Sequence, residues 1–299
     1  MKRLRLQLIN VYHVITSTFS NQYLWIGLIL TSIASCGIIN PAEEIPAYLK
    51  VDSVTFSALE FQGTSSQKIT DIWLDINGGI QGVYEIPVTF PVLDSGQIKA
   101  VISAGIMNNG IAATRVIYPF FFPDTLTLDL DEKEIYPLLP HFTYRPVTKF
   151  SFIEDFEAGN ILSQISGDSN LVRINDPSQV FEGSYSGYIY LNKEHNLYEG
   201  RTSNIYTIPK GSPVYLEMNY KCDQPFEIGL FVTLPGIGSI SLYKWVINTK
   251  ENWNKIYLEM GSELIALQAD QMQVQVRAEF DTTRLESHVY LDNLKLVNY

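Results

Sequence analysis

Beyond its first 35 residues the chain offers few side chains whose type and spacing could support catalysis. Its three histidines there, His141, His195 and His288, lie far apart, and none belongs to a His-x-x-x-His or cysteine pair of the kind that binds zinc. There is no Gly-x-Ser-x-Gly nucleophile elbow and no phosphate-binding glycine loop. Carboxylate pairs such as Glu154 and Asp155 could serve a glycosidase, but an acidic chain has many such pairs on solvated strand edges. We therefore expect a protein that is not an enzyme and has no catalytic residues.

Cys36 is the residue whose chemistry the sequence specifies most clearly. It follows a basic start, an apolar run from Tyr23 to Leu30 and the segment Ile33-Ala34-Ser35, which is the order of an export leader. The segment Ile33-Ala34-Ser35-Cys36 resembles the lipobox of bacterial lipoproteins. The resemblance implies that a leader, residues 1–35, is removed and that Cys36 carries the lipid, including palmitate-type acyl chains.

A lipid on Cys36 would place the protein in the cell envelope. Two or three acyl chains satisfy the rule that stable anchoring takes more than one lipid. The alternative is that the leader remains as a membrane-spanning anchor, but its apolar core is shorter than the ~20 residues that a spanning helix needs. We expect a lipid-anchored protein of the outer membrane, on its periplasmic face or at the cell surface, with residues 36–46 as a short tether.

The composition restricts the class of partner. The leader holds three of the 21 basic residues and none of the 32 acidic ones, so the remaining chain has a net charge near −14. Such a chain repels phosphate backbones, which argues against nucleic acid as a partner. After acylation of Cys36, Cys222 is the single remaining cysteine, so no disulfide can form within the chain. Its length suits two domains, each with its own hydrophobic core.

Most of the body alternates apolar and polar residues and is rich in Val, Ile, Thr, Tyr and Phe, which predicts β-strands. The best helical period is short, from Glu263 to Met272. Strands at this spacing, with turn residues between them, predict an all-β fold of two antiparallel β-sandwiches. Pro140 and Pro146 interrupt the pattern, so we predict a first domain over 47–147 and a second over 148–299.

The first domain contains a hairpin signal in the segment from Asp71 to Tyr84, where Asn77-Gly78 separates two strand patterns. A strand from Gln97 to Ile102 follows an Asp-Ser-Gly turn. The stretch from Ile69 to Gly105 resembles a PEGA-type surface domain, and the resemblance implies an Ig-like or transthyretin-like sandwich without catalytic residues. Farther on, Phe120 to Phe122 could form an exposed surface for a partner protein, but we favour a place in the core because contiguous exposed apolar patches are rare.

The second domain has three informative segments: Phe156-Glu157, the stretch from Phe181 to Tyr190, and the stretch from His288 to Leu296. They resemble the galactose-binding-like jelly rolls of carbohydrate-binding modules, over about Phe150 to Tyr299. The resemblance implies a jelly-roll sandwich. It specifies a sugar ligand only weakly, because a fold does not fix a function.

The same resemblance implies a structural Ca²⁺ where the two ends of the jelly roll meet, although no cofactor is required. By position its oxygen ligands would be Glu157, the turn from Gly183 to Ser186, and Asp292, all of the hard kind that calcium prefers. The alternative is that Asp292 caps a strand end and that Glu157 is solvated.

Sugar binding needs aromatic faces that can stack on pyranose rings. The candidates are Tyr198, Tyr206 and Trp245, none of which the sequence distinguishes from a core residue. Trp253 matches the tryptophan that packs inside such jelly rolls, so we expect it to be structural. Burial of Tyr198, Tyr206 and Trp245 together would count against sugar binding.

Two functions remain. We favour a non-catalytic, lipid-anchored accessory or interaction subunit that binds another protein of an outer-membrane assembly. The alternative is a glycan-binding surface lipoprotein that uses the second domain.

Overall fold

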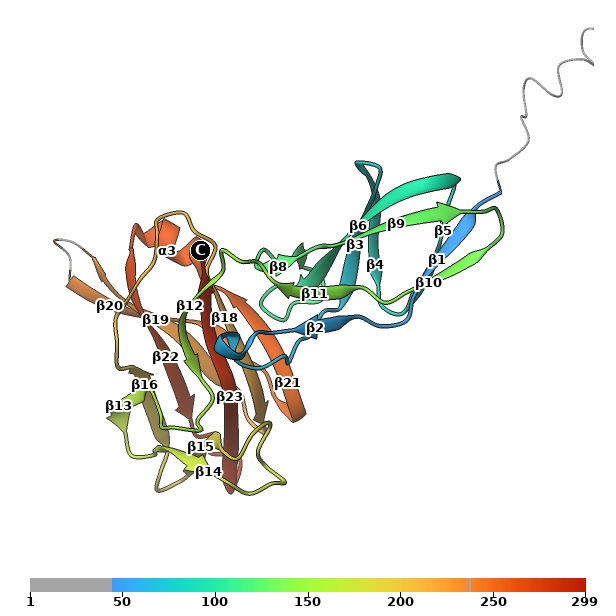
Figure 1. The fold of residues 1–299 in the computed structure, drawn as a ribbon. Coiled ribbons are helices and arrows are strands. Elements are labelled where there is room, and N and C mark those ends of the chain that lie inside the picture. Colours follow the sequence, from blue (N-terminus) through green and yellow to red (C-terminus); the bar gives the residue numbers. More distant parts are fainter. Residues whose placement is uncertain (1–44, 235, 237) are drawn as a thin grey trace, which may run out of the picture. The chain divides into compact units, whose positions relative to one another are not determined.

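The computed structural model describes residues 45–299, except 235 and 237. The predicted leader, the lipobox with Cys36 and most of the predicted 36–46 tether lie outside the described residues. Within the described part, none of the helices has the length and apolar character needed to cross a membrane. From Ala47 onward the chain forms one compact unit with two hydrophobic cores, and Figure 1 shows that it is built almost wholly of strands. The all-β prediction is confirmed.

The first sandwich packs a five-stranded sheet against two three-stranded sheets. In each three-stranded sheet the central strand has one parallel and one antiparallel neighbour. The five-stranded sheet comprises β3 (Asp71–Ile76), β4 (Gly79–Glu85), β6 (Gly96–Met107), β7 (Arg115–Ile117) and β9 (Asp124–Leu130). The smaller sheets comprise β1 (Ala47–Val51), β5 (Val88–Val92) and β10 (Ile135–Leu138), and β2 (Thr55–Ser57), β8 (Phe121–Phe122) and β11 (His141–Tyr144), with the 3-10 helix η1 (Glu60–Gln62) after β2.

The predicted hairpin is present. Strands β3 and β4 pair antiparallel, and the two residues between them, Asn77 and Gly78, have φ angles of 53° and 86°. Two consecutive positive φ values favour Asn-Gly, because both residues tolerate the left-handed region. The Phe120 to Phe122 segment is mainly core, as we favoured: Phe120 and Phe121 are buried, whereas Phe122 is half exposed, with the Arg145 guanidinium 5.7 Å from its ring centre.

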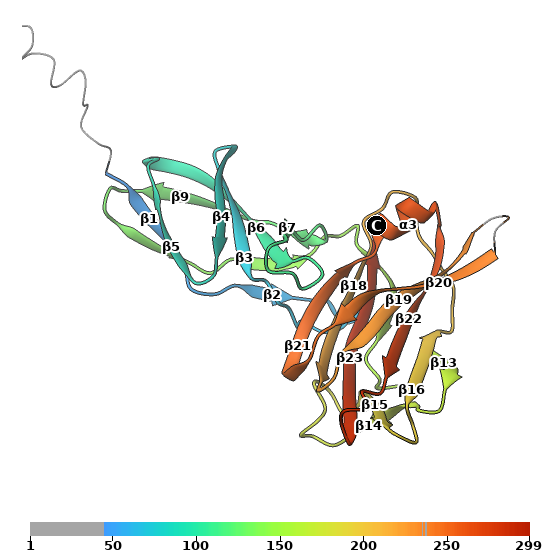
Figure 2. The ribbon, with the colours of Figure 1, turned by 180° about the vertical axis from the view of Figure 1, so that it is seen from behind.

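The second sandwich is a jelly roll of two six-stranded sheets, which Figure 2 shows from behind. Both sheets are antiparallel throughout the pairs between named strands. One sheet, called here the inner sheet, comprises β12 (Lys149–Glu154), β14 (Leu171–Ile174), β15 (Ser186–Asn192), β18 (Tyr215–Cys222), β21 (Lys250–Glu259) and β23 (Glu286–Asn298). The other, the outer sheet, comprises β13 (Leu162–Gly167), β16 (Leu197–Thr202), β17 (Tyr206–Thr207), β19 (Phe226–Leu234), β20 (Gly238–Ile247) and β22 (Gln271–Glu279).

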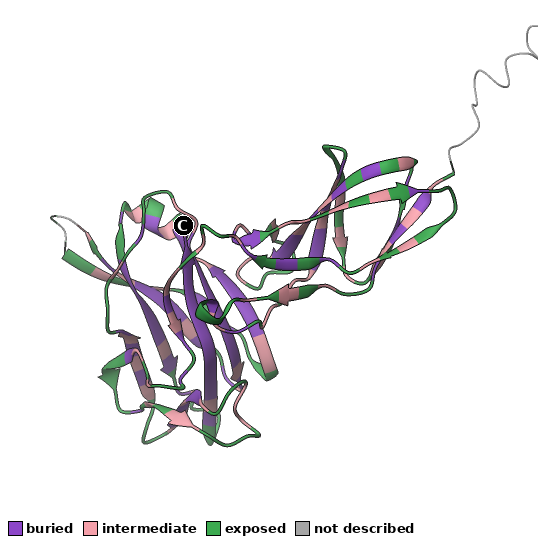
Figure 3. Ribbon diagram, viewed as in Figure 1, coloured by how far each residue is buried: buried purple, intermediate pink, exposed green. Residues whose placement is uncertain are grey.

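The inner sheet is buried on both faces along much of its length, which Figure 3 shows as nearly continuous purple on β23. Alternate residues of β23 serve different cores: Leu296 belongs to the core of the second sandwich, and Val297 belongs to that of the first. Tyr215 and Tyr257 likewise pack in the first core. The first sandwich therefore covers part of the inner sheet, and the far face of the outer sheet stays free of it.

The helix in the second sandwich, α3 (Gly261–Leu267), is shorter than the predicted 263–272 segment. It ends because Gln268 adopts a left-handed conformation, with φ 54° and ψ 28°, and closes the last turn with hydrogen bonds to helix carbonyls. Met272 belongs to β22 instead. Cys222 is buried and carries a free thiol.

Candidate functional site

The free face of the outer sheet concentrates polar side chains on four neighbouring strands. In β22 the side chains of Val274 and Val276 are fully buried in the core, and those of Gln273, Gln275 and Arg277 lie on the opposite face. Strands β16, β22, β19 and β20 lie side by side in that order, so their outward residues form rows across the sheet. We call this surface the polar face; its residues are Glu199, Arg201, Glu227, Gly229, Phe231, Ser241, Tyr243, Gln273, Gln275, Arg277 and Glu279.

The first row is an ion-paired cluster centred on Arg277. Glu199 on β16 and Glu227 on β19 lie opposite Arg277 in the register, one on each side. The Arg277 Nε atom lies 3.3 Å from Glu199 Oε1, and Nη1 lies 3.4 Å from Glu227 Oε2. Nη2 lies 2.6 Å from Oε2 of Glu279, the next outward residue on β22. The Arg277 side chain is 31 % exposed, so a ligand can reach it while the carboxylates hold it in place.

The second row crosses the sheet through Arg201, Gln275, Gly229 and Tyr243. Gln275 has no exposed area, and neither its amide nitrogen nor its amide oxygen has a hydrogen-bond partner among the described residues. A buried amide without partners is costly, typically by 1–3 kcal/mol. A ligand or water that donates to and accepts from this amide would remove that cost.

Tyr243 is the second unpaired group of this row. Its hydroxyl is buried and has no partner within the described residues. Burial raises the pKa of Tyr243 to about 12; the charge of Glu199 raises the pKa further, and Arg277 opposes the shift. The hydroxyl is therefore a neutral donor at physiological pH. Its ring lies over Gly229, where an added Cβ would come within 2.7 Å of Tyr243 Cδ1.

The third row contributes an aromatic ring and two polar residues. Phe231 on β19 lies opposite Gln273 on one side and Ser241 on the other. The guanidinium of Arg201 stacks over the Phe231 ring at 4.1 Å. The Gln273 side chain donates from Nε2 to the Thr202 carbonyl at 2.5 Å, which holds it in place.

Together the rows bring donors, acceptors and ring surface into one area. Guanidinium groups donate hydrogen bonds, carboxylates accept them, and an amide does both. The rings of Tyr243 and Phe231 supply apolar surface beside these groups, and both are partly exposed. This combination suits a neutral ligand that is rich in hydroxyl groups and has apolar C–H faces.

Two of the three aromatic residues predicted for sugar stacking lie in the hydrophobic core. Tyr198 has no exposed area and Trp245 is 7 % exposed; both belong to the core. Tyr206 is half-buried and lies opposite Met272 on the core side, with its ring 5.1 Å from that of Phe152. Burial of all three residues would count against sugar binding, but Tyr206 is not fully buried. None of the three residues lies on the polar face.

A β-bulge explains why the sequence suggested Trp245 rather than Tyr243. Ile228 pairs with Trp245, whereas the next residue, Gly229, pairs with Tyr243, so Lys244 is an extra residue on β20. The extra residue breaks the alternation of sides, and the two aromatic residues face opposite surfaces. The polar face had one sequence signal: the alternating Gln271-Met-Gln-Val-Gln-Val-Arg-Ala-Glu279 pattern, in which every outward residue is polar.

The predicted calcium ligands separate into two hydrogen-bonded groups. Glu157 Oε1 accepts from the backbone nitrogens of Ser184 at 2.7 Å and Tyr185 at 2.9 Å, and Gly183 comes so close that a Cβ there would lie 2.4 Å from the same oxygen. Ser186 Oγ donates to Asp292 Oδ2 at 2.5 Å. No group of three or more His, Cys, Asp or Glu side chains in the described part of the chain is arranged to hold a metal ion. Calcium binding at this place stays a prediction.

Trp253, which we expect to be structural, lies outside the core of the second sandwich and packs against other aromatic residues. It is half-buried on the inner sheet, where its ring contacts Phe181 at 5.3 Å and Tyr290 at 6.4 Å between ring centres. Tyr290 in turn stacks on Tyr188 at 4.9 Å, and the Lys221 ammonium covers its ring at 4.4 Å. Because these neighbours occupy one another's ring faces, this aromatic group offers a sugar less stacking surface than its composition suggests.

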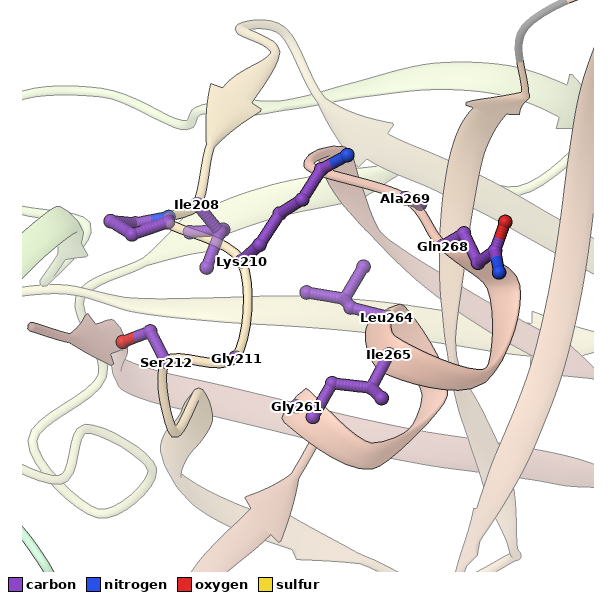
Figure 4. A pocket seen from close by; sticks show the side chains of 10 residues that line it. Ile208, Lys210, Gly211, Ser212, Gly261, Leu264, Ile265, Gln268 and Ala269 are labelled. Carbon is purple, nitrogen blue, oxygen red and sulfur yellow. The ribbon is translucent and has the colours of Figure 1, made fainter.

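A cavity of about 470 Å³ lies between α3 and the segment 208–212 (Figure 4). Its walls are mainly apolar, with Ile208 and Leu264 among them, and Lys210, Ser212 and Gln268 supply its polar side chains. Its lining among the described residues includes no aromatic residue and no carboxylate. We therefore prefer the polar face as the candidate site.

No protein-family model and no curated protein matches the sequence. The chain is similar to solved structures of carbohydrate-binding modules over about half its length. TmCBM61, solved in complex with β-1,4-galactotriose, is 17 % identical, with 49 % of this chain and 95 % of that chain covered and a TM-score of 0.33. A xylan-binding domain from CBM22 is 13 % identical, with 51 % and 97 % covered and a TM-score of 0.37. A family 11 module from Clostridium thermocellum, in complex with a β-1,3-1,4-mixed-linked tetrasaccharide, is 12 % identical, with 50 % and 94 % covered and a TM-score of 0.34.

Proposed function

We propose that the second sandwich binds a glycan on the polar face of its outer sheet. The observation that carries the proposal is the pair of unpaired polar groups, the Gln275 amide and the Tyr243 hydroxyl, in the row next to the Arg277 cluster. Sugar hydroxyls both donate and accept hydrogen bonds, so one sugar ring can satisfy an amide, a phenol and a guanidinium at once. The sequence favoured an accessory subunit of an envelope assembly; the polar face supports the glycan-binding alternative instead.

Each group on the face has a distinct part in this proposal. Glu199 and Glu227 accept hydrogen bonds from sugar hydroxyls while they hold Arg277 in plane. Arg277 donates to ring or hydroxyl oxygens. The Tyr243 ring, with Arg277 5.8 Å from its centre, packs against the apolar side of a sugar.

Access to Gln275 requires a local rearrangement. Its amide has no exposed area, so a sugar hydroxyl reaches it only after a neighbouring side chain moves. Arg201 is the residue beside it in the register, is partly exposed and is held by its stacking on Phe231. We propose that the ligand displaces the Arg201 guanidinium and takes its place over Phe231.

We further propose that the protein is a lipid-anchored, non-catalytic glycan-binding protein of the outer membrane. The lipobox sequence at Cys36 supports the anchor, and the sequence carries none of the catalytic motifs considered above. In such a protein the second sandwich would hold glycan near the membrane.

The test is a glycan array followed by calorimetry of each hit, with the full chain in detergent. We expect at least one neutral oligosaccharide to bind, and we expect Arg277→Ala and Gln275→Ala each to weaken binding tenfold or more. Arg284→Ala is the matched control, because Arg284 is an exposed arginine that pairs with Asp281 at 3.7 Å in a loop. Binding that persists unchanged in Arg277→Ala, or an array without hits, would overturn the proposal.

A further inference from the structure

A second cavity lies along the edge strand β21, where residues of both sandwiches meet. It has a volume of about 230 Å³. Lys68 and Asn109 line it from the first sandwich, and Lys250, Asn254 and Lys255 line it from β21. We call this cavity the lysine pocket.

The charge of the lysine pocket is opposite to that of the protein. The chain as a whole carries 32 acidic and 21 basic residues, yet the described lining of this pocket contains three lysines and no Asp or Glu. Lys255 is neutralised by Glu217 Oε2 at 2.8 Å. Lys68 and Lys250 are exposed, and neither forms a salt bridge with any described residue. Two positive charges therefore share one cavity without a counter-charge.

The two lysines are close enough to affect each other. Burial lowers the pKa of Lys68, and the charge of Lys250 lowers the pKa further. Neighbouring like charges destabilise each other, and an anion placed between them would remove that cost. The Lys68 ammonium also donates to Asn254 Oδ1, which fixes it to the β21 side of the pocket.

The walls that carry these groups are held by backbone hydrogen bonds to one residue of β21. The backbone nitrogen of Lys68 donates to the Tyr257 hydroxyl at 3.0 Å, and the backbone nitrogen of Asn109 donates to the Tyr257 carbonyl at 2.9 Å. Asn109 Oδ1 accepts from the Glu259 nitrogen at 2.8 Å, so its amide nitrogen is left as a donor. The segments that carry Lys68 and Asn109 are thus fixed to β21, which itself carries Lys250.

We propose that the lysine pocket binds a small oxyanion, a carboxylate, sulfate or phosphate group, between the ammonium groups of Lys68 and Lys250. This site is separate from the polar face, and its ligand is defined by charge rather than by sugar hydroxyls. The volume corresponds to about seven to eight water molecules at ~30 Å³ each, which accommodates one oxyanion and a small part of its carrier. Because the donors come from both sandwiches, the bound anion would tie them together.

The test measures thermal unfolding and calorimetric binding of the full chain with inorganic phosphate, sulfate, glucuronate and chloride at matched ionic strength. We expect at least one of the first three to bind with 1:1 stoichiometry and to raise the Tm above the chloride value, because a ligand that binds only the folded state stabilises it. The three arms separate phosphate, sulfate and carboxylate chemistry. Absence of binding by all three would overturn the proposal.

The variants locate the site. Lys68→Gln combined with Lys250→Gln should lower affinity at least tenfold and abolish the rise in Tm, whereas Lys193→Gln, at an exposed lysine of the second sandwich, should leave both unchanged. If the double variant and Lys193→Gln lost anion affinity equally, or if the double variant bound the anion as the unaltered chain does, the pocket would not be the site. Arg277→Ala should keep full anion binding, so failure of the polar-face proposal and failure of this one remain distinguishable.

Discussion

Tyr118 of the first sandwich donates its hydroxyl to Glu217 Oε1 of the second at 2.8 Å, and both side chains are fully buried. Tyr144 donates to the same oxygen at 2.8 Å, and the Lys255 ammonium lies 2.8 Å from the other. A single carboxylate on β18 therefore joins the two sandwiches through charge-assisted hydrogen bonds, in an environment where unpaired polar groups are costly.

Removal of the Glu217 carboxylate should destabilise the protein strongly. Glu217→Ala leaves the buried Lys255 ammonium without its counter-charge and two tyrosine hydroxyls without their acceptor, and breaking a buried ion pair in this way costs about 3–5 kcal/mol. Urea denaturation should show this loss, and the exposed Glu194→Ala should change the free energy of unfolding by less than about 0.5 kcal/mol. Equal stability of the two variants would contradict the prediction.

Lys295 should make the protein more stable as the pH rises from about 7 to 10. Burial lowers the pKa of Lys295 to about 7, although Glu217 opposes the shift, and its Nζ donates to the Thr64 carbonyl at 2.8 Å. Between that value and the unfolded value near 10.4 the unfolded chain binds one more proton, so the free energy of unfolding rises with pH by up to ~1.4 kcal/mol per unit. Lys295→Met should remove this slope relative to the unaltered chain in denaturation series at pH 7–10. An identical slope in both would refute the assignment.

Asp292 should make the protein less stable as the pH rises from about 4 to 7. Burial raises its pKa to about 7, while hydrogen bonds from Ser186 and the Asn293 nitrogen oppose the shift. From about pH 4 to 7 the folded protein holds a proton that the unfolded chain has released, so stability falls as the pH rises through this window. Asp292→Asn keeps the size of the side chain and removes the titration. Its unfolding free energy should fall less between pH 4 and 7, and a curve parallel to that of the unaltered protein would rule the prediction out.

The sequence predicted the all-β fold and the Asn77-Gly78 hairpin because both depend on local signals, namely alternation and turn chemistry. It could not predict which face of a strand points into a core. On β23, Leu296 and Val297 are both buried because two sandwiches meet across the inner sheet, so apolar residues fall on both sides of the strand.

The candidate site was missed for a related reason. Tyr243 and Trp245 are two residues apart, and in a regular strand two such side chains lie on the same face. Only the bulge at Lys244 places them on opposite faces. Arg277 and its three carboxylates come from three strands that are distant in the chain, and the sequence alone does not give their register.

Replacement of Trp245 by alanine should therefore lower mainly stability, whereas replacement of Tyr243 by alanine should lower mainly glycan binding. Trp245→Ala removes a buried core side chain and should cost about 3–5 kcal/mol of stability. Tyr243→Ala removes a partly exposed ring of the polar face and should abolish glycan binding at a smaller cost in stability. Calorimetry and urea denaturation of both variants test the assignment, and a Trp245→Ala protein of normal stability that has lost glycan binding would reverse it.

Gly229 should be required for the shape of the polar face. A Cβ at this position would lie 2.7 Å from both the Leu242 carbonyl oxygen and Tyr243 Cδ1, so Gly229→Ala must push β20 or the Tyr243 ring outward. Overpacking of this kind costs about 1–3 kcal/mol, and the displaced ring should weaken glycan binding as well. Gly159→Ala is the matched control, because Gly159 has no neighbouring atom within 4 Å of the added carbon. If Gly229→Ala bound glycan as tightly as Gly159→Ala, the Tyr243 ring would not be part of the binding surface.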